Sequence, residues 1–290
     1  MKKFASRAAV PVLAVAVSLA PMSAGAALIP GIGSPAPTPT KPRAATPTTD
    51  TFNVLGGGHT RGRGGMRSGP ARMKGTLSLL RKHEVTLAGF QELETRQAAA
   101  FRKRTKGKWG LVGAPSRSGK SIDNRNAIAF LKHDFSLLKK TSIPITYFHG
   151  NRVNIPLLKL KSKTNGKAFW ILNTHNPADV HGSAARWRAE SLRRELKRIH
   201  RLRSQGHTVL FTGDMNDKQA FFCKATRSGK LHSASGGSSG KKCRYPSKNG
   251  IDWVLGTRDV RFAKWRSDTS TRGRGISDHP FVFARATISR

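Results

Sequence analysis

The chain has 290 residues, 37% of them hydrophobic and 23% charged, which is ordinary for a globular protein and excludes a wholly disordered chain. Its 53 Lys and Arg against 15 Asp and Glu give a formal charge of +38. This charge favours an anionic partner such as nucleic acid, phospholipid or an anionic wall polymer, without choosing among them. Two cysteines are too few for a disulfide-framework miniprotein or a cysteine-rich zinc module.

The N-terminal segment has the pattern of an export signal. Three basic residues within the first seven precede an uncharged stretch at 8–29, and the small triplet Ala24-Gly25-Ala26 follows its most apolar part. This order predicts a signal peptide over residues 1–26 and a secreted, extracellular protein. An uncleaved membrane anchor is the alternative, because the stretch approaches the roughly 20 residues that span a bilayer. Export would expose Cys223 and Cys243 to an oxidising compartment, where we expect them to form a disulfide.

A linker is predicted next, over residues 27–49. Residues 30–49 contain six Pro and five Thr without apolar periodicity, so they can bury little and should remain extended. All fifteen acidic residues and 48 of the basic residues lie in residues 50–290. The charge therefore belongs to one folded domain over residues 50–290.

Short β-type runs alternate with helical stretches along this domain. Strands are predicted at 51–55, 85–90, 126–131, 152–160, 168–174, 208–213, 251–255 and 280–288. Helices are predicted from Pro70 onward, where Met73, Leu77 and Leu80 share one face, and over 91–104. A third helix, over 183–202, carries an apolar stripe formed by Leu192, Leu196, Ile199 and Leu202. The pattern predicts a mixed α and β domain.

A glycine-rich segment, GGGHTRGRGG at 56–65, follows the first predicted strand. It lacks the P-loop pattern, which disfavours a nucleotide-binding motor. Its backbone could approach a phosphate closely, with His59, Arg61 and Arg63 nearby. A flexible basic surface loop is the equal alternative.

The scarce acidic residues stand at strand ends. Glu92 and Asp214 follow predicted strands, Asp252 opens a strand and Asp278 precedes the last one. Strand ends that meet at a sheet edge bring such side chains together, although a single carboxylate there is usually a turn or cap residue.

Two chemistries are available at such an edge. Asn53, Glu92 and Asp278 would form an oxygen-rich site suited to Mg²⁺, Ca²⁺ or Mn²⁺. His175 and His279 would supply groups that titrate near neutral pH.

Six segments in order resemble the endonuclease/exonuclease/phosphatase superfamily, in its deoxyribonuclease-like branch. They are FNVLG at 52–56, GFQELE at 89–94, NTHNPAD at 173–179, TGDMND at 212–217, IDWVL at 251–255 and SDHP at 277–280. The resemblance implies a four-layer α-β-β-α sandwich, two packed mixed β-sheets flanked by helices, with the site at one end. Asn53 is followed by Val54-Leu55, without the second acidic residue of abasic-site endonucleases, so that branch is disfavoured.

The resemblance implies a role for each matching residue. A divalent metal, Mg²⁺ with Ca²⁺ or Mn²⁺ as alternatives, would be bound by Asn53, Glu92 and Asp278. His279 would be the catalytic His, oriented by Asp252. Which group is the general base is left open.

The remaining residues would contact the phosphate. Asp214 and Asn216 match the pair that positions water and phosphate, and His175 matches a second His at a non-bridging oxygen or the leaving group. Asn126 and Arg152 are candidate phosphate contacts from their positions at strand ends, with ordinary strand-end polar residues as the alternative.

A phosphodiester repels an anionic nucleophile, so a metal cation and an imidazolium are needed together while a base generates hydroxide. We therefore expect a secreted, divalent-metal-dependent phosphoesterase, a nuclease that cleaves nucleic acid with little sequence preference. A phospholipid (sphingomyelinase-like) or small-phosphoester hydrolase is one alternative. A non-catalytic polyanion-binding module is the other, and the acidic and His set argues against it. Association with an anionic cell surface fits the charge, and no protein partner is implied.

Overall fold

The computed structural model describes residues 46–60, 66–239 and 242–289. The predicted signal peptide, residues 27–45 of the predicted linker, and Arg61 and Arg63 lie outside these ranges. Within them, no helix combines the length and apolar character needed to cross a membrane.

Twelve strands in the described ranges form two six-stranded sheets. The first sheet has the order β11 (Val260–Asp268), β12 (Phe281–Ile288), β1 (Thr48–Asn53), β2 (Leu87–Gln91), β4 (Ile122–Leu131), β3 (Trp109–Pro115). The second has the order β5 (Phe135–Thr146), β6 (Arg152–Ser162), β7 (Ala168–His175), β8 (Val209–Asp214), β10 (Asp252–Thr257), β9 (Leu231–Ser233). Each sheet contains one parallel pair, β1 with β2 and β7 with β8, and its other neighbours are antiparallel. Both sheets are therefore mixed.

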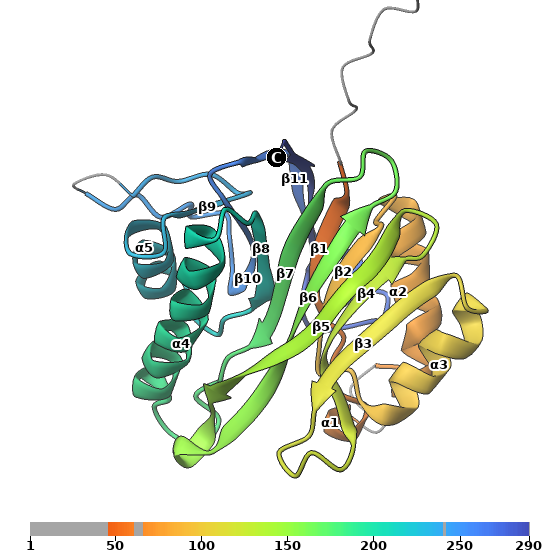
Figure 1. Ribbon diagram of the computed structural model, residues 1–290. Helices are drawn as coiled ribbons and strands as arrows, with labels where there is room; N and C mark the ends of the chain where they lie inside the picture. The colour runs from red at the N-terminus through yellow and green to blue at the C-terminus, as the bar shows by residue number, and fades with distance from the viewer. Residues whose placement is uncertain (1–45, 61–65, 240–241, 290) are drawn as a thin grey trace, which may run out of the picture. The chain divides into compact units, whose positions relative to one another are not determined.

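Helices cover the outer face of each sheet. α2 (Gly69–Lys82) and α3 (Thr95–Thr105) pack on the first sheet, and α4 (Ala185–Ser204) and α5 (Gln219–Arg227) on the second, as Figure 1 shows. A one-turn helix, α1 (Gly57–Thr60), and two 3₁₀ turns, η1 (Phe148–Gly150) and η2 (Thr269–Thr271), complete the described elements. The predicted four-layer α-β-β-α sandwich is confirmed.

The central strands are buried on both faces, and alternate side chains serve different cores. On β2 and β4, Leu87 and Ile128 face the second sheet, whereas Phe90 and Ala127 face α2 and α3. This explains why the central strands are continuous apolar runs rather than alternating polar and apolar ones.

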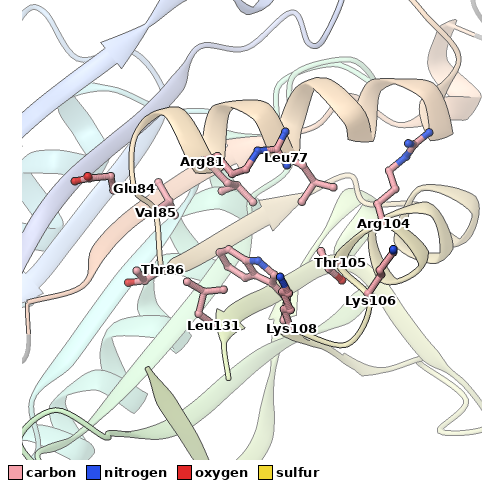
Figure 2. A pocket seen from close by; sticks show the side chains of 12 residues that line it. Leu77, Arg81, Glu84, Val85, Thr86, Arg104, Thr105, Lys106, Lys108 and Leu131 are labelled. Carbon is pink, nitrogen blue, oxygen red and sulfur yellow. The ribbon is translucent and has the colours of Figure 1, made fainter. Parts of the chain in front are cut away.

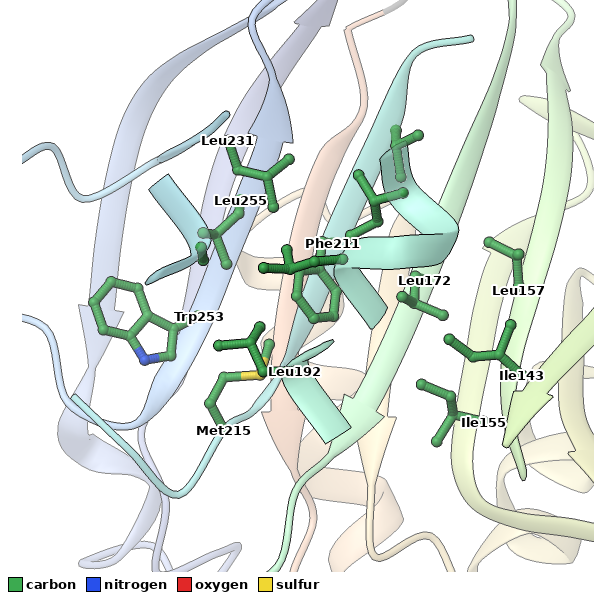
Figure 3. Packing of buried hydrophobic residues seen from close by; sticks show 14 of the residues in the cluster. Ile143, Ile155, Leu157, Leu172, Leu192, Phe211, Met215, Leu231, Trp253 and Leu255 are labelled. Carbon is green, nitrogen blue, oxygen red and sulfur yellow. The ribbon is translucent and has the colours of Figure 1, made fainter. Parts of the chain in front are cut away.

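The outer core of the second sheet contains the predicted helical stripe. Figure 3 shows Leu192 of α4 packed among Leu172, Phe211, Met215 and Trp253 of the strands and the loop beyond β8. Its three other members are buried in the same cluster. The helix prediction over 183–202 is confirmed with a shift of two residues at each end.

A buried polar seam joins the two sheets beneath one end of the sandwich. Gln91 Nε2 donates to Asn173 Oδ1 at 2.7 Å, and Thr212 Oγ1 donates to the same oxygen at 3.1 Å. A Cβ at Gly89 would lie 2.4 Å from both Asn173 Oδ1 and Thr212 Oγ1. Glycine is therefore required at this close approach of the sheets.

Two boundaries differ from the prediction in ways that have a physical reason, and two helices were not predicted. β1 begins at Thr48 and pairs with β12 through Thr48 and Thr49, so the linker ends at least two residues before position 49. Thr48 and Thr49 are β-branched residues, which favour strands, but the Pro- and Thr-rich composition around them predicted a linker. The second helix begins at Thr95, because Gln91 is the last residue of β2. α1 and α5 were not predicted.

The expected disulfide is present. Cys223, on α5, is bonded to Cys243, 20 residues further along, and both sulfurs pack against the outer core of the second sheet.

Candidate active site

Strand direction brings the predicted residues to one edge. Asn53 is the last residue of β1, Glu92 follows β2, and His175 and Asp214 end β7 and β8. Because both parallel pairs point the same way, these four side chains meet between the sheets. Asp252 opens β10 opposite Asp214, since β10 runs antiparallel to β8.

Asn53 bridges the carboxylates of the two sheets. Its Nδ2 donates to Glu92 Oε1 at 2.9 Å and to Asp214 Oδ2 at 3.2 Å. Its Oδ1 accepts the Leu55 N–H at 3.0 Å. The amide therefore presents its NH₂ group to the site, and its carbonyl oxygen, the predicted metal ligand, is turned towards the backbone.

Glu92 is held in an ionised state. Its φ is 56°, in the left-handed region. Gly56 N–H donates to Oε2 at 2.8 Å, and His59 Nε2 lies 3.2 Å from the same oxygen. Burial by itself would raise the pKa of Glu92, but the His175 charge, the Gly56 N–H, Asn53 and His59 together lower it.

His279 and Asp252 form a buried ion pair. His279 Nδ1 lies 3.0 Å and 3.1 Å from the two Asp252 oxygens, and Nε2 lies 3.6 Å from Asp214 Oδ2. Burial opposes the charge on His279, but Asp252 and Asp214 raise its pKa to about 10. The imidazolium therefore predominates at neutral pH. Its Nδ1–H donates to Asp252, and its Nε2–H is free to donate to a bound group.

The loop that carries His279 is fixed by hydroxyl groups. Ser277 Oγ donates to the Asn53 carbonyl at 2.6 Å and accepts the His279 N–H at 3.1 Å. Thr271 Oγ1 donates to the His279 carbonyl at 2.6 Å. Ser277, the serine of the S-D-H segment, thus ties His279 to the end of β1.

His175, Asp214 and Asn216 form the other side of the site. Asn216 has a φ of 48°, and its N–H donates to Asp214 Oδ1 at 2.9 Å. Its Nδ2 donates to the Asn176 carbonyl at 2.8 Å and lies 3.1 Å from His175 Nε2. His175 Nε2 is 3.4 Å from Asp214 Oδ2. The predicted aspartate and asparagine pair is therefore one rigid turn that orients His175.

These groups form the floor of a cavity of about 460 Å³. A cavity of similar size, about 490 Å³, lies at the opposite end of β2, between α2, α3 and the start of β3 (Figure 2). Among the described residues that line this second cavity are aliphatic and basic side chains, one carboxylate, Glu84, and no histidine. Of these two cavities, the first brings carboxylates and histidines of the described chain together.

Two predicted residues do not join the network. Asp278 is exposed, and its Oδ1 accepts a long hydrogen bond from the hydroxyl of its neighbour Ser277 at 3.4 Å. Arg152 is exposed and does not line the cavity. Asn126 does line it, because it pairs with Gln91 across β2 and β4, and its buried Oδ1 has no partner among the described residues.

The cavity also contains residues that were not predicted. Asp123 and Arg125 of β4 form a bidentate pair, with the shortest contact 2.7 Å. Tyr147 lines the cavity as a neutral phenol, because burial and the charges of Glu92 and Asp214 raise its pKa to about 12. Phe148 follows it on η1. No short motif in the sequence marks these residues. Tyr147 and Phe148 follow β5, which was not predicted, and Asp123 and Arg125 lie in the part of β4 that precedes the predicted strand.

The donor set fits a divalent cation at Glu92. In a chain with 53 Lys and Arg, no described Lys or Arg forms an ion pair with this ionised carboxylate. Asp214, Asp252 and His279 also offer ligand atoms within 4.8 Å of one another, which makes them a candidate metal site. A protonated His279 has no lone pair for a metal, so the ion pair accounts better for that cluster. Glu92 would hold the metal, whereas Asp278, the predicted second carboxylate, is exposed and outside the cavity lining.

A two-sheet sandwich with an ion-paired His, a paired Asp and Asn, and an ionised Glu at one edge defines a phosphoesterase. The chain belongs to the Endonuclease/Exonuclease/phosphatase family, which it matches over residues 51–279. Enzymes of this family hydrolyse phosphoesters with a divalent metal. No curated protein sequence matches the chain.

Solved structures share the fold. An endonuclease/exonuclease/phosphatase family protein from Bacteroides thetaiotaomicron has a TM-score of 0.65 at 16% identity, covering 86% of this chain and 97% of that chain. The catalytic domain of human Nocturnin with bound sulfate has a TM-score of 0.65 at 16% identity, covering 84% and 95%. A mannosyl-6-phosphatase of B. thetaiotaomicron has a TM-score of 0.62 at 16% identity, covering 83% and 99%.

Proposed function

We propose that this protein is an exported, divalent-metal-dependent nuclease that hydrolyses nucleic-acid phosphodiesters with little sequence preference. The observation that carries the proposal is the His279–Asp252 ion pair beside Asp214 and Glu92, at the floor of an open cavity in a chain of charge +38. The predicted signal segment at 1–26 supports export.

The chain's own residues divide the work. The Nε2–H of His279 donates to a phosphoryl oxygen, while Asp252 keeps the ring charged and oriented. Asp214 and Asn216 hold the water and phosphate, and His175 contacts the opposite oxygen or the leaving group. A divalent metal on Glu92, with Mg²⁺ as our first choice, would offset phosphate charge and lower the pKa of bound water.

Charge favours a polyanionic substrate over a small phosphoester. Lys and Arg contacts to successive phosphates release counterions, so the dissociation constant and the Michaelis constant for DNA should rise together with salt. Phosphate contacts carry no base information, so duplexes of unrelated sequence should be bound and cut alike.

A substrate panel tests the proposal. Purified protein is incubated with supercoiled plasmid, RNA, sphingomyelin vesicles, mannose 6-phosphate and bis(4-nitrophenyl) phosphate, each with Mg²⁺, Mn²⁺, Ca²⁺ or EDTA. We expect metal-dependent nicking of plasmid. Turnover of sphingomyelin or the sugar phosphate alone would contradict nuclease activity but not phosphoesterase activity. DNA binding without turnover of any substrate would indicate a binding module.

Export has a separate test. Expression of the full chain with fractionation should place it in the medium, starting near residue 27. Recovery in the membrane with residues 1–26 intact would instead indicate an anchor.

A further inference from the structure

One side of the catalytic cavity is apolar. Tyr147, Phe148 and Val180 line the cavity together with Glu92, His175 and His279, and Phe148 packs against Tyr147 and against His181, the neighbour of Val180. Val180 is 71% exposed, the highest value among the large hydrophobic residues exposed in the described chain. A hydrophobic surface that opens onto a polar catalytic floor indicates a substrate with an apolar group beside its phosphate.

Phe148 is held in place from behind. Its ring is 4.5 Å from that of Tyr147 and 4.8 Å from that of His181, both edge to face, and 6.4 Å from that of Trp187. The η1 turn is closed by hydrogen bonds from Asn151 N–H to the Phe148 carbonyl at 3.0 Å and from Gly150 N–H to the Tyr147 carbonyl at 3.1 Å. A ring fixed in this way binds a planar group without losing much conformational freedom.

Cations flank the same turn. Arg117, on the β3–β4 hairpin, donates to Asn151 Oδ1 at 3.1 Å, and Arg152 opens β6 next to it with its side chain exposed. Neither is in an ion pair with any described residue, whereas Arg125 within the cavity is neutralised by Asp123. The apolar side is thus bordered by positive charge suited to the phosphates on either side of a nucleotide.

We propose that Tyr147, Phe148 and Val180 form a subsite for the nucleobase adjacent to the scissile phosphate. This subsite rests on the proposed nuclease function and names its substrate class, a phosphodiester that carries a base. The contact surface is ring and hydrocarbon, so any base stacks on it, in keeping with weak sequence preference. A sugar phosphate or an unsubstituted alkyl phosphodiester has no group to fill it.

A matched pair of substrates tests the subsite. Thymidine 5′-(4-nitrophenyl phosphate) and its analogue with hydrogen in place of thymine have the same scissile bond and leaving group. We expect the wild-type protein to prefer the thymine substrate in kcat/KM by roughly tenfold or more. Phe148→Ala should bring this ratio close to one, and Phe148→Trp should preserve it.

Two further variants separate stacking from folding. Val180→Ser alters a surface side chain and should lower the ratio without changing the melting temperature. Leu138→Ala, also on an exposed hydrophobic residue but eight residues before the end of β5, should leave the ratio unchanged. The ratio compares two substrates on one protein preparation, so a partly unfolded sample does not affect it.

The outcomes distinguish this subsite from the function it rests on. Equal hydrolysis of both substrates by the wild type, or an unchanged ratio in Phe148→Ala, would overturn the proposed nucleobase subsite. Metal-dependent plasmid nicking in the same experiment would still support the proposed nuclease function. Preference for a vesicle-bound lipid that is lost in Val180→Ser would assign the apolar side to a membrane and also overturn it. Absence of metal-dependent turnover of every phosphodiester would contradict the proposed function itself.

Discussion

Glu195→Gln should stabilise the protein at neutral and alkaline pH. Glu195 is fully buried on α4, behind the site, where its Oε2 lies 3.5 Å from Asn176 Nδ2. Burial raises its pKa from 4.5 to about 7, although hydrogen bonds from Thr174 and Asn176 lower it in part. Between pH 4.5 and about pH 7, Glu195 is therefore protonated in the folded state and ionised in the unfolded state.

The sign and size of the effect follow from this difference. Stability from Glu195 is fully present below pH 4.5 and is lost as the pH rises to about 7, and a shift of this size corresponds to about 3 kcal/mol. Glutamine keeps the shape of the protonated acid and does not titrate. The unfolding free energy of the variant relative to wild type should therefore increase by up to about 3 kcal/mol between pH 4.5 and pH 8.

Urea denaturation followed by tryptophan fluorescence at several pH values measures this difference. Glu190→Gln is the control on the same helix, because Glu190 is partly exposed and ion-paired with Arg193 and Arg194. Its pKa is lowered to about 2 by Arg193 and Arg194, so its loss should destabilise at neutral pH, by less than about 1 kcal/mol. A Glu195→Gln difference that does not vary with pH would refute the reasoning.

The remaining predictions concern the scaffold. Replacing Cys223 and Cys243 with alanine should lower the unfolding free energy by about 3 kcal/mol, because the disulfide closes a loop of some twenty residues, and intact mass after alkylation without reductant should show no free thiol. Gly89→Ala should cost about 1–3 kcal/mol by forcing the two sheets apart, whereas Gly250→Ala, with open space around it, should be neutral in the same denaturation assay. Burial by itself would raise the pKa of Asp268, but hydrogen bonds from Ser270, His83 and Lys82 lower it below 3.8. Asp268→Asn should therefore destabilise the protein at pH 7, and this destabilisation should disappear as the pH falls below 3.8.

The eight strands predicted from apolar runs are all present, and the four that were not predicted are the edges of the two sheets. β3 and β11 border the first sheet, and β5 and β9 border the second. Edge strands pack on fewer neighbours and carry charge, as the Lys and Arg residues of β5 and β11 do, so they lack the continuous apolar pattern. Hydrophobic periodicity thus identifies the interior of each sheet and leaves its borders unmarked.

The site was predictable where strand ends carry an acid or a histidine. Asn53, His175 and Asp214 end central strands, Glu92 follows one and Asp252 begins one. The two parallel pairs and the antiparallel pairing of β8 with β10 are enough to bring them together. The apolar side of the cavity was not predictable, because it depends on the end of β5, an edge strand. The direction of the Asn53 amide was equally hidden, since a hydrogen bond to the Leu55 backbone sets it.

The central claim is that Glu92 and His279 serve metal-dependent phosphodiester hydrolysis rather than polyanion binding. The most direct test is the rate of plasmid nicking by wild type, Glu92→Gln and His279→Ala over a Mg²⁺ titration, with DNA affinity measured on the same preparations. We expect each variant to lose two or more orders of magnitude in turnover while DNA binding and folding persist, because a metal ligand or a positioned acid has been removed. Near-wild-type, Mg²⁺-dependent nicking by either variant would contradict the account.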